Sequence, residues 1–286
     1  METNFNILKL FRNILLLLLL TSSIGFSQNN LLKSGNNLIK VGNNLIAITP
    51  FNQFSMLFDG VDECVNIDNV RTALASTTEG AWSIWYKPGT LTNANIIGFG
   101  DANANTLIVI NPFTDSKVYI TCVSSGTTQW KVETDNAVIS TGTWIHIVLV
   151  QDGTAAAPEI YINKIKVAQT NNVSVDNSFW FNDLSGLDRG RIGCRNSNSA
   201  GNSNFTDGNI DEVLFFNKAL TQSEISDIYN NGKPRQEANI ANGVSFFRMG
   251  DKSTFSGGNF TFVDQIGTNN GTSINMELND KKLDTP

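Results

Sequence analysis

The spacing of apolar segments constrains this chain more than any other feature. From Ser55 to about Asn217, short runs of apolar and β-branched residues alternate with Gly, Asn, Asp and Pro. Such a pattern predicts strands joined by turns. The predicted strands are Ser55–Phe58, Cys64–Ile67, Trp82–Tyr86, Asn95–Gly98, Thr106–Ile110, Lys117–Val123, Gln129–Glu133, Trp144–Gln151, Glu159–Ile162, Lys164–Ala168, Gly190–Gly193 and Asp211–Phe216.

Two details indicate how these strands are arranged. The segment from Trp144 to Val150 is apolar on both faces, so it is expected at the centre of a layered structure. Only one helix is predicted: Thr221 and Glu224 form a capping box, and Gly232 ends the helix. The fold class is therefore all-β, a two-sheet antiparallel sandwich with one short helix near the C-terminal end of the domain.

Charge excludes some partners. Lys and Arg number 20 against 26 Asp and Glu, which gives a net charge of −6. This balance argues against binding nucleic acid or an anionic membrane, since both need a basic surface. The chain has a single His, which excludes a metal site with several His ligands.

The first residues predict export. Lys9 and Arg12 precede a short apolar core that begins at residue 14, and Gly25 and Ser27 supply small residues before a cleavage point at Gln28. Residues 1–27 are predicted to be a signal peptide. The mature chain is expected to be secreted, extracellular or at the cell surface, without a membrane span.

Residues 28–53 contain three copies of a seven-residue repeat that begins with Asn-Asn. The Asn pairs and recurrent Gly oppose a coiled coil, so a linker or N-terminal strands are expected. The three cysteines, Cys64, Cys122 and Cys194, permit one disulfide and one free thiol, or three buried thiols.

Four segments in order resemble a known family. They are 58–65 (FDGVDECV), 82–88 (WSIWYKP), 144–164 (with WIHIV and IYINK) and 208–225 (with GNIDEV and ALTQSEI). They resemble the LamG-like jelly roll of the concanavalin A-like lectin/glucanase superfamily. Lys164 stands where that family usually has Gly. The resemblance implies a concanavalin A-like jelly roll over residues 54–235, with two curved sheets and a concave binding face.

Within residues 236–286, the stretches 244–251 (VSFFRMGD) and 264–272 (DQIGTNNGT) resemble the segment that joins successive copies of this domain. We expect this C-terminal extension to add strands to the sandwich or to form a linker.

The sequence lacks the catalytic pattern of the glucanase branch. That pattern alternates three acids on one strand, but Ala137 follows Glu133 and Asp135 at the third position. Asp211 and Glu212 are adjacent and are expected on opposite faces. His146 lies mid-strand and is interpreted as a hydrogen-bonded core residue. The chain is therefore predicted not to be an enzyme.

Two places are candidates for a calcium ion, which prefers six to eight oxygen ligands. The first is the loop that carries Asp101 and Asn103. The second pairs Asp59 or Asp62 with Asp211, where the opening and closing strands of such jelly rolls meet.

A sugar site needs an exposed aromatic ring and nearby polar groups. Trp130 and Trp180 lie outside the segments that carry the resemblance, and Asn182 and Asp183 follow Trp180. These four residues are the candidates for binding carbohydrate. The leading hypothesis is a secreted, non-catalytic module that binds carbohydrate or a glycoprotein surface through its concave face or rim loops. The alternatives are a structural or adhesive component of a cell surface or virion, and a glycoside hydrolase.

Overall fold

The computed structural model describes residues 38–41, 44–47, 52–234 and 241–286. The chain divides into two units, residues 1–51 and 52–286. In the first unit, β1 (Leu38–Val41) and β2 (Asn44–Ala47) form an antiparallel hairpin from the second and third copies of the repeat. The predicted signal peptide lies outside the described residues.

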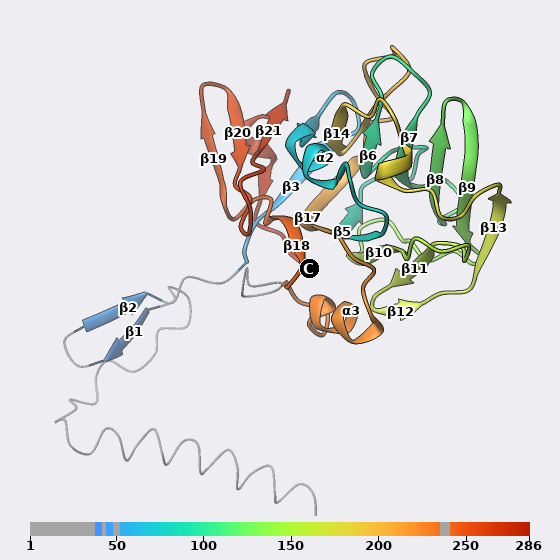
Figure 1. The fold of residues 1–286 in the computed structure, drawn as a ribbon. Coiled ribbons are helices and arrows are strands. Elements are labelled where there is room, and N and C mark those ends of the chain that lie inside the picture. The colour runs from blue at the N-terminus through green and yellow to red at the C-terminus, as the bar shows by residue number, and fades with distance from the viewer. Residues whose placement is uncertain (1–37, 42–43, 48–51, 235–240) are drawn as a thin grey trace, which may run out of the picture. The chain divides into compact units, whose positions relative to one another are not determined.

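The second unit is a sandwich of two large antiparallel sheets (Figure 1). The first, the eight-stranded sheet, has β18 (Gly243–Phe247) paired to β17 beside its main path. That path runs in order through β12 (Ile165–Lys166), β11 (Glu159–Ile162), β10 (Ile145–Gln151), β5 (Gly80–Pro88), β17 (Asp207–Phe216), β3 (Ser55–Asp59) and β22 (Lys281–Lys282).

The second sheet has ten strands, and a small separate pair, β15 (Arg195–Asn196) and β16 (Asn202–Ser203), accompanies it. Its order is β13 (Gln169–Ser174), β9 (Thr127–Thr134), β8 (Val118–Ser124), β7 (Leu107–Pro112), β6 (Ile97–Gly100), β14 (Arg189–Ile192), β4 (Cys64–Asn66), β21 (Gly271–Ile274), β20 (Asn259–Phe262) and β19 (Ser253–Ser256).

Between the sheets lies one continuous apolar core. Its centre is aromatic: the ring of Trp82 lies 5.1 Å from Phe99 and 5.5 Å from Trp180, and all three are fully buried. Alternate residues of the central strands supply this core, as period-two patterning requires. The all-β, two-sheet jelly-roll prediction is confirmed.

The predicted helix is α3 (Gln222–Tyr229). Thr221 Oγ1 accepts a hydrogen bond from the backbone N–H of Glu224, and the Glu224 carboxylate accepts one from Thr221, so the capping box is confirmed. Ile225 and Ile228 pack on the outer face of the eight-stranded sheet. In Figure 1, α3 lies at the foot of the sandwich near β10 and β11.

A second helix, α2 (Asp68–Leu74), was not predicted from the sequence. Seven residues are too few for a clear helical period, and the helix is held by Val70 and Leu74 in the core. Two 3₁₀ turns, Phe181–Asp183 and Leu278–Asp280, complete the helical elements among the described residues. No helix in this part of the chain is long and apolar enough to cross a bilayer.

The C-terminal residues add strands to both sheets. β18 pairs with β17 and β22 with β3, while β21 pairs with β4 and continues into β20 and β19. Cys64 and Cys194 form a disulfide between β4 and the residues that follow β14, and Cys122 is a buried free thiol.

Candidate functional site

A hollow of about 310 Å³ opens on the outer face of the ten-stranded sheet. This volume is at the lower end of the ~300–1,000 Å³ of small-molecule sites. Its floor is formed by Leu107, Val109 and Val123, which make an apolar cluster separate from the core. On β7, Leu107 and Val109 alternate with Ile108 and Ile110, which face the other sheet. The same alternation that fills the core therefore leaves an apolar floor outside.

Aromatic and amide side chains surround this floor. Tyr119 and Phe113 lie with ring centroids 4.9 Å apart. The Tyr119 hydroxyl donates a hydrogen bond of 2.7 Å to Asp115, and this bond, with burial, raises the pKa of Tyr119 to about 12. Asn111 donates to Ala94 O at 2.9 Å, which fixes its amide. The other polar lining residues are Asn93, Asn105 and Thr121. Such a set offers a ring to stack on and groups to hydrogen-bond hydroxyls.

Two glycines position a cation over one side of the hollow. On β6, a Cβ at Gly98 would lie 3.0 Å from Arg195 Cβ, and a Cβ at Gly100 would lie 2.3 Å from the carbonyl oxygen of Asn196. Because neither glycine carries a side chain, β15 can cross directly over β6. The Cys64–Cys194 disulfide ties down the residue before Arg195. The Arg195 side chain consequently lines the hollow.

Lys131 of β9 lines the opposite side. In register, Gly98 faces Val109, Val109 faces Thr121, and Thr121 faces Lys131. Three strand spacings of about 4.8 Å therefore separate the backbones of β6 and β9, or roughly 14 Å. The Lys131 ammonium lies 5.0 Å from the centroid of the Tyr119 ring. No Asp or Glu is among the residues that line the hollow within the described chain.

The tryptophans that the sequence suggested as sugar platforms are not available for that role. Trp130 and Trp180 are both fully buried. Trp130 alternates with Lys131 on β9, so it faces the other sheet, and its indole N–H donates to Phe179 O at 3.0 Å. Trp180 packs against Trp82 in the core. A ring with no exposed face cannot stack on a sugar, so this part of the prediction is wrong.

Asn182 and Asp183 are exposed, but they belong to the turn that seats Trp180. The Asp183 carboxylate accepts hydrogen bonds from the backbone N–H of Trp180, at 3.1 Å, and from the Asn182 amide, at 3.2 Å. Neither lines the hollow.

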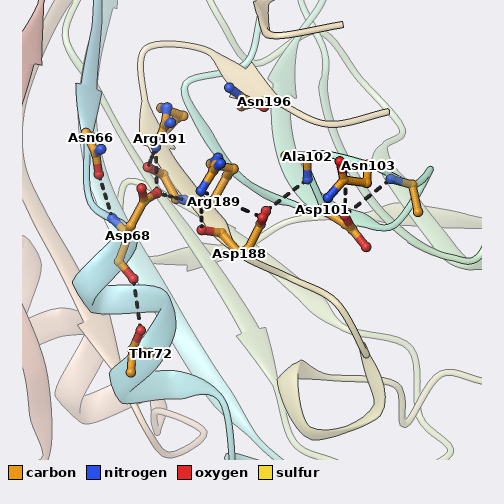
Figure 2. A network of polar contacts seen from close by, with 12 residues as sticks. Asn66, Asp68, Thr72, Asp101, Ala102, Asn103, Asp188, Arg189, Arg191 and Asn196 are labelled. Atoms are coloured by element: carbon orange, nitrogen blue, oxygen red, sulfur yellow. Dashed lines mark hydrogen bonds and ion pairs between the residues drawn. The ribbon is translucent and has the colours of Figure 1, made fainter. Parts of the chain in front are cut away.

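The Asp101 loop borders the hollow through Asn105, and its acids already have partners. One Asp101 oxygen accepts the backbone N–H groups of Asn103 and Ala104, at 2.7 and 3.2 Å, and Asp188 accepts that of Ala102 (Figure 2). These bonds are those of a carboxylate-capped turn. Three His, Cys, Asp or Glu side chains gather as a metal site nowhere in the described residues.

The second predicted calcium set does not assemble. Asp59 pairs in register with Asp207, so Asp211 lies four residues farther along β17, about 13 Å away. Asp59 accepts from the backbone N–H of Val61 at 2.8 Å, and Asp62 is exposed. The sequence placed these acids at the meeting of two strands but could not give the register. Neither acid set fits an ion that needs six or more oxygens, and calcium binding stays an untested prediction.

Asp211 and Glu212 do not point to opposite faces as expected. The Asn52 amide donates to both, at 2.9 and 3.0 Å, because β17 bulges between Asp211 and Leu214 and Glu212 has a φ of 46°. Both acids are buried, and burial, with the Glu212 charge, raises the pKa of Asp211 well above its usual value. They are closed to a substrate.

His146 is a core residue, as the sequence indicated. It is fully buried, with Nε2 2.7 Å from Ser83 Oγ, and burial lowers its pKa to about 3.

Comparison with known families assigns the fold. The sequence signature of the Laminin_G_3 family, described as the concanavalin A-like lectin/glucanases superfamily, matches residues 59–226. The chain belongs to this superfamily. The resemblance found in the sequence is confirmed. A search of curated protein sequences finds no match.

Several solved structures share the superfamily fold at low identity. One is a candidate carbohydrate binding protein from Bacteroides ovatus, with 13% identity, 78% of this chain and 58% of that chain covered, and a TM-score of 0.55. Another is the Ruminococcus gnavus IT-sialidase CBM40, bound to α2,3 sialyllactose. It has 12% identity, with 62% of this chain and 96% of that chain covered, and a TM-score of 0.50. A third is the NanB sialidase from Streptococcus pneumoniae, with 17% identity, 76% of this chain and 34% of that chain covered, and a TM-score of 0.51. The chain therefore spans about a third of that enzyme. At such identities the likeness shows the fold alone.

Proposed function

We propose that this protein is an exported, non-catalytic module that binds carbohydrate in the hollow on the ten-stranded sheet. The observation that carries the proposal is the hollow itself: an apolar floor, the Tyr119 ring, and amides such as Asn111 around it. A pyranose has one apolar face and a rim of hydroxyls, which is the chemistry that this lining complements.

The fold neighbours support the same class of ligand. The Ruminococcus gnavus module is bound to sialyllactose, and the Bacteroides ovatus protein is a candidate carbohydrate binder. The absence of enzyme activity is also part of the proposal. It is supported by the full burial of His146 and Asp211, which leaves these groups without access to a substrate.

Export is proposed from the N-terminal sequence pattern and the cysteine chemistry. A disulfide such as Cys64–Cys194 persists in an oxidising compartment. Mass analysis of the mature chain tests this part, with Gln28 as the expected first residue.

Glycan-array binding of the mature chain tests the function. We expect binding to a subset of glycans, lost in Tyr119→Ala and kept in Val175→Ala, which removes an exposed apolar side chain elsewhere. Running the array with calcium and with EDTA tests the calcium prediction separately. Binding to no glycan under either condition would overturn the proposal and leave protein–protein adhesion as the remaining function.

A further inference from the structure

Arg195 and Lys131 lack carboxylate partners. Ion pairs occupy other cations of the described chain: Arg191 lies 2.6 Å from Asp68, and Lys117 lies 3.4 Å from Glu133. No ion pair involves Arg195 or Lys131 among the described residues. Other cations of the described residues, such as Lys164 and Lys252, also form no ion pair, so the distinguishing feature of Arg195 and Lys131 is that both line one hollow.

Arg195 also bears a cost that the protein does not offset. Its guanidinium is half-buried, and its covered Nε has no hydrogen-bond acceptor in the described residues. Taking a cation out of water without an anion is unfavourable. Burial lowers the pKa of Arg195, but an Arg side chain stays protonated at neutral pH.

The nearby acids do not supply the missing anion. Asp115 accepts the Tyr119 hydroxyl, and Glu133 pairs with Lys117. The lining offers only neutral side chains besides the two cations. An oxyanion from outside would therefore meet positive charge from both sides of the hollow.

We propose that the hollow binds an acidic saccharide, whose carboxylate or sulfate pairs with Arg195 while its ring rests on the Val109 floor beside Tyr119. Lys131 supplies the second positive charge from the opposite side. The planar guanidinium suits an oxyanion with two parallel hydrogen bonds. This inference rests on the proposed carbohydrate function and narrows its ligand class.

Pairs of acidic sugars and neutral counterparts test it by calorimetry. The probes are 3′-sialyllactose against its methyl ester, lactose 3′-sulfate against lactose, and tetragalacturonate against its methyl ester. We expect each bound acidic sugar to bind at least about tenfold tighter than its neutral counterpart, since charged hydrogen bonds are the stronger ones. Added salt should weaken only the acidic partner. Preference for the sialyl or uronic acid probe assigns a carboxylate, and preference for the sulfate probe assigns a sulfate ester.

Variants locate the effect. Arg195→Gln should remove most of the charge preference, and Lys131→Gln should remove a smaller part. Lys166→Gln, which removes an exposed cation of β12 that pairs with Glu159 outside the hollow, is the control and should leave sugar binding unchanged. If Arg195→Gln does not fold, the wild-type preference and its salt dependence still decide the ligand class.

The failures can be told apart. Equal affinity for charged and neutral counterparts would overturn this inference and leave the carbohydrate function standing. A charge preference that survives Arg195→Gln would overturn the assignment to Arg195. If the protein binds neither the probes nor any glycan on the array, the carbohydrate function is overturned, and this inference is overturned with it.

Discussion

The outer faces of the two sheets differ in what covers them. On the eight-stranded sheet, Ile225 and Ile228 of α3 pack on an apolar surface that includes Leu214 and Phe216. On the ten-stranded sheet, the apolar strip at Val109 forms a small cluster of its own under the hollow. The first face is closed by the chain itself. The second face keeps an apolar floor, an aromatic ring and two cations that form no ion pair within the described residues, and these are the groups that the proposed binding surface uses.

The two sheets also differ in where their charged side chains lie. The acids buried around the eight-stranded sheet, such as Asp211, sit where burial opposes ionisation, while Arg195 and Lys131 face the hollow. A chain with a net charge of −6 thus presents a local positive site.

The largest expected effect is on the closed face. Ile225→Ala should lower the free energy of unfolding by about 3 kcal/mol, since it leaves a cavity between α3 and the sheet. Urea unfolding measures the change, and glycan binding should be unaffected. The control is Ile165→Ala, whose side chain is 59% exposed and should cost no more than about 0.5 kcal/mol. Equal costs for both variants would mean that α3 does not close this face.

The second-largest effect is expected at β15, the strand that carries Arg195. Gly100→Ala places a Cβ 2.3 Å from the Asn196 carbonyl oxygen, so β15 must move. We expect a loss of about 1–3 kcal/mol in stability and loss of acidic-sugar binding. Gly126→Ala, with a φ of 83° and nothing within 4 Å, should cost about 1 kcal/mol and keep binding. Unchanged binding in Gly100→Ala would separate β15 from the site.

A pH effect is expected from the enclosed acids. Burial and a hydrogen bond with Asp280 raise the pKa of Glu63 from 4.5 to about 8. The native state therefore holds a proton that the unfolded chain releases near pH 4.5, so the contribution of this group is present below that pH and is lost as pH rises toward 8. Glu63→Gln mimics the protonated form and should flatten this part of the pH–stability profile. Parallel profiles for both proteins between pH 5 and 8 would contradict the raised pKa.

The smallest effect is expected at the rim. Tyr119→Phe removes an exposed hydrogen bond to Asp115 and should cost less than about 1 kcal/mol. Because the ring remains, sugar affinity should stay within about threefold of wild type, whereas Tyr119→Ala should lose binding. A large loss in Tyr119→Phe would assign the binding to the hydroxyl and not to the ring.

Much of the scaffold could be predicted from local patterns. Alternating apolar runs indicated the strands, and Thr221 with Glu224 marked the start of α3. The helix α2 was not predicted because its seven residues are too few to show a helical period. Cysteine pairing stayed open because spacing alone does not bring two strands together.

The site was harder because it depends on register and facing. Trp130 and Lys131 are neighbours on one strand, and period two places one in the core and one outside without saying which. The Trp130 ring was predicted to stack on a sugar, but Lys131 beside it is the residue that lines the hollow. A usable signal was present in Gly98 and Gly100, since alternate glycines on a strand indicate close approach of another backbone.

The central claim is that sugars bind the outer face of the ten-stranded sheet. Amide chemical-shift mapping of the folded protein with 3′-sialyllactose tests it most directly, with lactose as reference. We predict that the shifts cluster at Val109, Thr121, Lys131 and Arg195, while α3 stays unchanged. Shifts that cluster on α3, or that avoid these four residues, would contradict the account.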